Sequence, residues 1–198
     1  MPITNGQVVE RLNAVYLKGK TDYNLKLRRK ENTKWCRIVA RITDPLLALF
    51  THDKRKGFMD RCTTIGNIVY FPTGWTYGAN PEWDLVMLRH ELKHVRQFAC
   101  LNPFGLWPIG VVLSLVFYLL LPLPIGLAWF RYAMERQAFI ETMRTRIELG
   151  KPIDIEYYVE LMAGPMYGFA WPFKHAVRGW FAEHIRPFQV IQTDSNKT

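Results

Sequence analysis

The pattern of apolar and polar residues is mixed before residue 80 and helical after it. β-branched and aromatic residues cluster at Trp35 to Ile42 and at Asn67 to Phe71, and this predicts two strands. Residues 7 to 18 have the apolar spacing of a short helix, and that spacing continues from Pro81 almost to Arg186. A small β-containing part followed by helices predicts an α+β fold.

The helix predicted to begin at Pro81 has a marked start and two distinct faces. Asn80 can cap it, and proline is favoured at the first helical position. At about 100° per residue, one face carries Leu85, Leu88, Leu92, Val95 and Ala99, and the opposite face carries Met87, His90, Glu91, His94 and Phe98. Arg89, Lys93 and Arg96 fall between these faces, where we expect them to contact water.

The face opposite the apolar one carries the sequence His90-Glu91-Leu92-Lys93-His94, an HExxH motif. Histidines four residues apart project from the same side of a helix, so their imidazoles can bind one metal ion. Glu91 lies about 100° further round, where it can reach a metal-bound water but is poorly placed to be a ligand. The pattern predicts a zinc site with His90 and His94 as ligands and Glu91 as the catalytic base.

A catalytic zinc site needs a third protein ligand, and Glu135 is the best candidate. It lies 41 residues after His94 on a predicted second helix, where the small Ala138 allows close approach. The alternative for Glu135 is a surface ion pair with a neighbouring arginine. The rival ligands are Glu141, His175 and His184.

These motifs resemble those of the zincin metallopeptidases, in particular the gluzincins, which combine HExxH with a downstream glutamate often found as ExxA or ExxAD. The resemblance covers the strand Asn67 to Phe71, the helix Pro81 to Cys100 and the helix around Glu135. It implies a zincin-like fold, zinc ligation by His90, His94 and Glu135, proton transfer by Glu91, and a substrate that extends along the preceding strand. Position 139 departs from the pattern, since phenylalanine replaces the aspartate that often supports the first histidine. The extended metzincin motif is absent, because Gln97 and Cys100 occupy its glycine and histidine positions.

An apolar insert separates the two parts of the expected site. No charged residue occurs from Gln97 to Phe130, and the run is long enough to span a bilayer once. A single span would put His94 and Glu135 on opposite sides of the membrane. We therefore expect residues 105 to 130 to form a helical hairpin, broken at Pro122-Leu123-Pro124, that dips into the membrane. The alternative is a hairpin buried in a protein core or an oligomer interface.

Composition and charge place some limits on function. The 198 residues are 49% hydrophobic, which suits a single domain over residues 1 to 198. The net charge is +9, and residues 1 to 61 hold fourteen Lys or Arg against six Asp or Glu. Lys26 to Lys30 has no interleaved aromatic residues, so nucleic acid is not an expected partner. Three cysteines without metal spacing and no visible secretory signal favour a cytoplasmic protein.

The function predicted from the sequence is a zinc-dependent, membrane-associated metallopeptidase that cuts a peptide or protein substrate. Two alternatives remain: a catalytically inactive protein that zinc stabilises, and a basic module that binds a membrane surface or nucleic acid. The candidate donors to the reaction's oxyanion are Tyr157, Tyr158, Tyr167 and His175, and the sequence does not choose among them.

Overall fold

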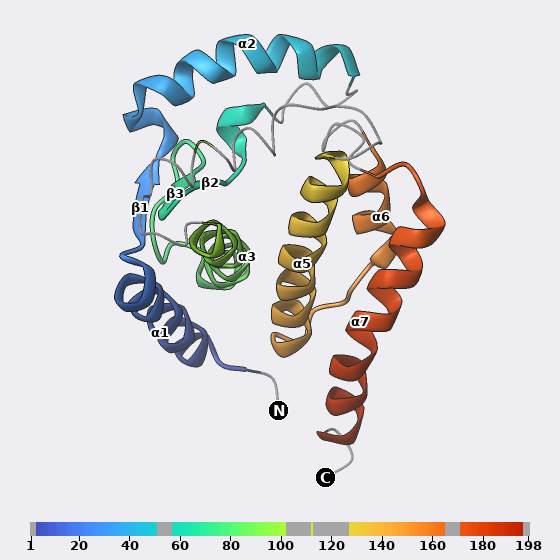
Figure 1. The fold of residues 1–198 in the computed structure, drawn as a ribbon. Coiled ribbons are helices and arrows are strands. Elements are labelled where there is room, and N and C mark those ends of the chain that lie inside the picture. The colour runs from blue at the N-terminus through green and yellow to red at the C-terminus, as the bar shows by residue number, and fades with distance from the viewer. Residues whose placement is uncertain (1–2, 51–56, 102–111, 113–126, 165–170, 196–198) are drawn as a thin grey trace.

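The described strands form one small sheet within residues 26–71, and helices make up most of the molecule (Figure 1). A computed structural model of the chain describes residues 3–50, 57–101, 112, 127–164 and 171–195. Its elements are α1 (Asn5–Tyr23), β1 (Lys26–Arg29), η1 (Lys30–Asn32), α2 (Lys34–Phe50), η2 (Phe58–Asp60), β2 (Thr63–Ile65), β3 (Ile68–Phe71), α3 (Pro81–Cys100), α5 (Leu127–Glu148), α6 (Ile155–Ala163) and α7 (Lys174–Ser195). These elements confirm the predicted general α+β class.

The described sheet has the strand order β1-β3-β2, so β3 is its central strand. β1 pairs with β3 in parallel, and β2 pairs with β3 in an antiparallel hairpin that turns at Gly66, whose φ is 61°. Glycine suits this turn because it adopts positive φ at no steric cost. β3 confirms the strand expected at Asn67 to Phe71. Both edges of β3 are paired within the described sheet, so β3 has no free edge with which an extended substrate could pair.

The strand expected at Trp35 to Ile42 is a helix, α2. Its β-branched residues suggested a strand, but the burial follows the helical period: Cys36 and Ala40 are buried, while Ile38 and Ile42 are exposed. Residues four apart thus share an environment, as on the faces of a helix. Tertiary packing of this one face outweighs the modest β preference of valine and isoleucine.

α3 begins where the sequence predicted, and several contacts hold its first turn. Asn80 Oδ1 accepts a hydrogen bond from the Trp83 backbone N at 3.2 Å. The Asp84 carboxylate accepts from Trp75 Nε1 and from the Gly78 backbone N, each at 2.7 Å. An acidic side chain in the first turn also interacts favourably with the helix dipole. The start of α3 is therefore fixed to the loop that leaves the sheet.

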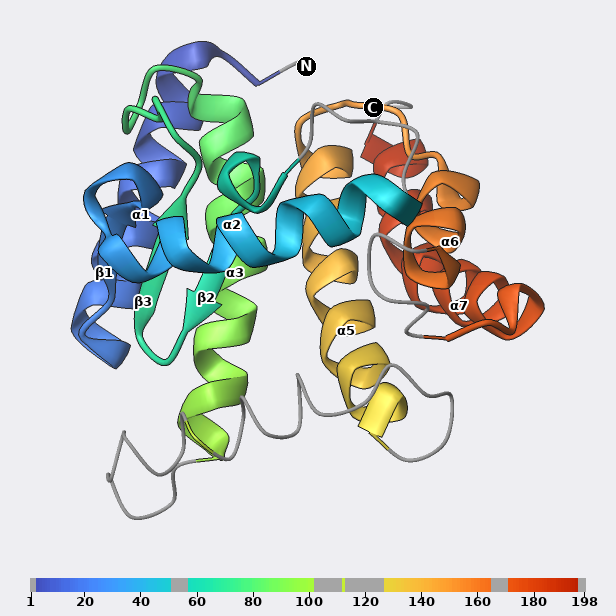
Figure 2. The same ribbon diagram turned by 90° about the horizontal axis from the view of Figure 1, so that it is seen from above.

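α1 and the sheet lie on one side of the pair formed by α3 and α5, and α6 and α7 lie on the other, as Figures 1 and 2 show. Each side has its own apolar cluster. The first joins α1, the sheet and the Leu85, Leu88, Leu92 and Val95 face of α3. The second joins α5, α6 and α7 around Phe139, Met143 and Phe181. α3 and α5 pack against each other, with contacts from Arg89 and Glu148 to Gln97 and Met134. The motif face of α3 therefore meets α5 at the boundary between the clusters.

Arg89 also lies at this boundary, which corrects the expectation that it contacts water. Its Nη1 atom lies 2.5 Å from Glu148 Oε2 and donates to Thr145 Oγ1 at 3.3 Å. Both partners belong to α5, and only 21% of the Arg89 side chain is exposed. Arg89 thus helps to hold α5 against α3.

The predicted apolar hairpin at residues 105 to 130 lies outside the described residues, except for Val112 and the start of α5. Within the described part of the chain, none of the helices combines the length and the apolar character needed to cross a bilayer.

Candidate metal centre

The HExxH motif lies in the interior, between α3 and α5. His90, Glu91 and His94 are 5%, 4% and 7% exposed, although all three are polar. Burying such groups costs free energy unless they are paired or bind an ion. The two histidines are therefore not solvated side chains on the exposed face of an amphipathic helix.

α5 places Glu135 directly opposite the two histidines. Glu135 Oε2 lies 3.8 Å from His90 Nε2 and 3.5 Å from His94 Nε2, and Glu135 is only 3% exposed. One ligand atom from each residue lies within 4.8 Å of the other two, so the three could hold a metal ion. In a tetrahedral zinc site with ligands at about 2.0 Å, neighbouring donor atoms are about 3.3 Å apart. The two separations from Glu135 Oε2, 3.8 Å and 3.5 Å, are close to that spacing.

The other nitrogen of each imidazole has its own partner, which leaves both Nε2 atoms facing Glu135. His90 Nδ1 lies 2.9 Å from Thr142 Oγ1, and the hydroxyl of Thr142 lies within hydrogen-bonding distance of the Ala138 carbonyl. His94 Nδ1 lies 2.9 Å from Gln97 Oε1, and the amide of Gln97 donates to the Met134 carbonyl. Because Gln97 Oε1 can only accept, the proton of a neutral His94 sits on Nδ1. Such partners orient metal-binding histidines and fix their tautomers.

Thr142 supplies the support for His90 that the sequence left unassigned. Phe139, in the position where gluzincins often have aspartate, packs its ring against His90 with the centroids 5.1 Å apart. Thr142 is one turn further along α5, on the same face as Glu135 and Ala138. The spacing of seven residues from Glu135 could have indicated it, but the sequence does not show which helical faces meet.

The electrostatics of the centre favour a positive charge between its residues. Burial lowers the pKa of His90. Burial acts in the same direction on His94, but Glu135, Glu91 and Gln97 together outweigh it and raise the pKa of His94 to about 9. Glu91 adds a second buried negative charge nearby. A cation, whether a proton or a metal ion, therefore stabilises this arrangement.

The carboxylate of Glu91 contacts the sheet. Its Oε2 atom accepts a hydrogen bond from Thr64 Oγ1 of β2 at 2.6 Å. On α3 the two histidines thus face Glu135 of α5, and the carboxylate of Glu91 contacts β2. Thr64 was not identified from the sequence, because a threonine in a three-residue strand carries no recognisable signal.

β2 is itself anchored by Lys30, which is fully buried. Its Nζ atom donates to the Phe58 carbonyl at 2.6 Å and to Thr63 Oγ1 at 2.8 Å, and lies 3.7 Å from the centre of the Phe58 ring. Burial lowers the pKa of Lys30 to about 8, although negative charge on Cys62, Cys36 and Glu91 would raise it. Lys30 thus holds one face of β2 while Thr64, on the other face, holds Glu91.

The rival ligands are not part of this cluster. His175 and His184 are exposed on α7, where His184 stacks on Trp180 and its Nδ1 lies 2.8 Å from the Trp180 carbonyl. Glu141 lies on α5 but is not among the clustered donors. Of the tyrosines considered as oxyanion donors, Tyr158 is buried in the α5–α7 cluster and Tyr157 is 56% exposed. Tyr167 lies outside the described residues.

Comparison with known proteins adds no relative to this picture. No protein-family model matches the chain, and neither a curated protein nor a solved structure shows significant similarity to it. The assignment of function therefore rests on the geometry of His90, Glu91, His94 and Glu135.

Proposed function

We propose that this protein is a zinc-dependent metallopeptidase with His90, His94 and Glu135 as the zinc ligands. The observation that carries the proposal is that two imidazole nitrogens and one carboxylate oxygen lie close together in the interior. The Nδ1 atoms of the two histidines contact Thr142 and Gln97 instead. Two histidines and one carboxylate leave a fourth position for water or substrate, as catalytic zinc sites require.

The bound zinc and the base Glu91 have separate roles in the proposed reaction. Zinc supplies Lewis acidity, which makes water more acidic and polarises a carbonyl group. Glu91 accepts the proton of the attacking water and later delivers it to the leaving amine. The Thr64 hydroxyl donates to Oε2 of this carboxylate, which leaves Oε1 to exchange the proton. Burial of Glu91 shields this exchange from bulk water.

β2 is the best candidate for the strand along which a substrate lies. It is an edge strand of the described sheet, and its residue Thr64 contacts Glu91. An extended peptide that pairs with β2 would therefore pass beside the base. This assignment replaces β3, the strand favoured by the resemblance to gluzincins.

Metal analysis and a peptide digest test the proposal. Purified protein should contain one zinc per chain, and His94→Ala and Glu135→Ala should each lower the occupancy strongly. Glu91→Gln should retain zinc and lose at least a hundredfold in hydrolysis, the typical contribution of a general base. Zinc without hydrolysis in the wild-type protein would favour the inactive, zinc-stabilised alternative. A protein that binds no zinc would contradict the proposal altogether.

A further inference from the structure

A pocket of about 910 Å³ lies along the outer edge of β1. Its lining is Leu27, Arg28, Arg29, Asn32, Thr33, Lys34, Trp75, Thr76 and Tyr77. None of the four residues of the candidate metal centre belongs to this lining. The pocket is therefore a separate feature that the proposed peptidase chemistry does not use.

One side of the pocket is the backbone of an edge strand. Among the described strands β1 pairs with β3 alone, and the Lys26 backbone N donates to the Asn67 carbonyl. Because successive residues of a strand direct their backbone groups to opposite edges, Leu27 and Arg29 direct theirs away from β3. Both residues line the pocket. The Arg29 carbonyl already accepts a hydrogen bond from Thr33 Oγ1 at 3.3 Å. An extended chain placed there can therefore pair as an added strand with the N–H and C=O groups of Leu27 and with the N–H group of Arg29.

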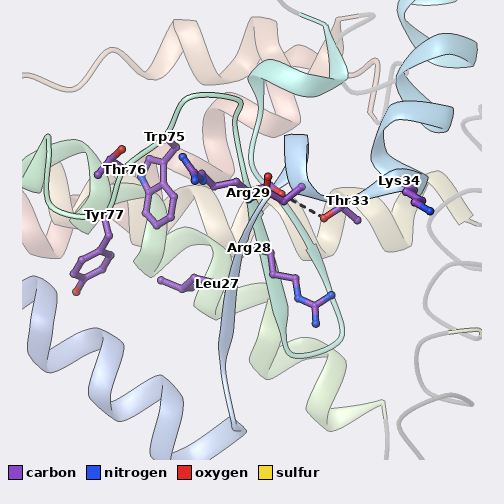
Figure 3. A pocket seen from close by; sticks show the side chains of 9 residues that line it. Leu27, Arg28, Arg29, Thr33, Lys34, Trp75, Thr76 and Tyr77 are labelled. Atoms are coloured by element: carbon purple, nitrogen blue, oxygen red, sulfur yellow. Dashed lines mark hydrogen bonds between the residues drawn. The ribbon is translucent and has the colours of Figure 1, made fainter.

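The two walls beside this edge differ in chemistry, as Figure 3 shows. Leu27, Trp75 and Tyr77 lie on one side of β1. The Trp75 ring is held in place by stacking on Phe71, with the centroids 3.8 Å apart, and by its hydrogen bond to Asp84. This wall is aromatic and apolar, and its central ring is fixed before any ligand arrives.

The opposite wall is basic. Arg28 and Lys34 are exposed there, on the side of β1 away from Trp75 (Figure 3). Arg29, on the aromatic side, forms an ion pair with Glu31 at 3.2 Å. The pocket lining contains three cationic side chains and no acidic one. A ligand that carries negative charge only on the side facing Arg28 and Lys34 would match the pocket.

We propose that this pocket binds an extended peptide segment in which apolar and acidic residues alternate. Alternate side chains of a strand point to opposite sides, so one set would contact Leu27, Trp75 and Tyr77 while the other set pairs with Arg28 and Lys34. The strand edge favours a peptide over nucleic acid, because a peptide pairs with backbone N–H and C=O groups. The proposal is independent of the metal centre.

The test measures binding of a fluorescent eight-residue peptide of alternating valine and glutamate. Arg28→Glu should weaken binding at least tenfold. Arg37→Glu is the matched control, because Arg37 is an exposed cation of α2 that does not line the pocket, and it should leave binding nearly unchanged. A peptide N-methylated at alternate residues should also bind at least tenfold more weakly, since it cannot complete the strand pairing.

Three results would overturn the proposal. The first is equal weakening by Arg28→Glu and Arg37→Glu, which would indicate attraction by net charge alone. The second is full binding of the N-methylated peptide, which would exclude strand addition. The third is displacement of the peptide by a single-stranded oligonucleotide that binds more tightly, which would assign the pocket to nucleic acid. His94→Ala should bind the peptide like wild type, so failure of the metal proposal leaves this test intact.

Discussion

Replacing Thr142 with valine tests whether the hydrogen bonds behind the histidines serve metal binding. Valine has almost the same shape as threonine but cannot accept a hydrogen bond, so the 2.9 Å contact with His90 Nδ1 is lost. The proton of His90 can then move to Nε2, the atom that faces Glu135, and block ligation.

The expected effect is a loss of about tenfold in zinc affinity, equivalent to about 1.4 kcal/mol. Loss of such a partner costs ten- to a hundredfold in metal affinity. We expect the lower end of this range because the Ala138 carbonyl also hydrogen-bonds to the His90 ring and remains in the variant.

The assay is competition for zinc against a chromophoric chelator, with unfolding in urea measured in parallel. Thr145→Val is the matched control, because Thr145 is a fully buried threonine on the same helix whose partners are Arg89 and the Glu141 carbonyl, not a histidine. The control should lose stability without losing zinc affinity. Equal zinc affinity in wild type and Thr142→Val would refute the reasoning.

Three further predictions concern the base, the buried lysine and the apolar insert. Thr64→Val should lower kcat about tenfold, because it removes roughly the contribution of one charge-assisted hydrogen bond. The zinc affinity should not change. An unchanged kcat would show that Thr64 does not position Glu91. Because the folded-state pKa of Lys30 lies near 8, below its ordinary value of 10.5, the unfolded chain binds this proton more tightly between these pH values. The free energy of unfolding of wild type relative to Lys30→Met should therefore rise from pH 8 to 10.5, by up to about 3 kcal/mol, and a constant difference in urea titrations would contradict this. Leu115→Arg with Phe117→Lys should release the protein from membranes in detergent-free fractionation, and wild type that is already soluble would exclude the membrane hairpin.

The sequence determined those features that depend on local spacing. Asn80 and Pro81 set the start of α3, and the helical period separated its apolar face from the face with His90, Glu91 and His94. Because these residues lie within two turns of one helix, their relative positions follow from helix geometry alone. The choice of Glu135 also came from the sequence, through the resemblance to gluzincins and the small neighbouring Ala138.

The tertiary structure decided every feature that depends on which surfaces meet. α2 is a helix because Cys36 and Ala40 pack on one face, and that packing is invisible to local β preference. Contacts such as Thr142 with His90 and Thr64 with Glu91 join residues 52 and 27 positions apart in the chain. No local pattern encodes such a distance, because the energy of each contact is gained only after α5 and β2 have packed against α3.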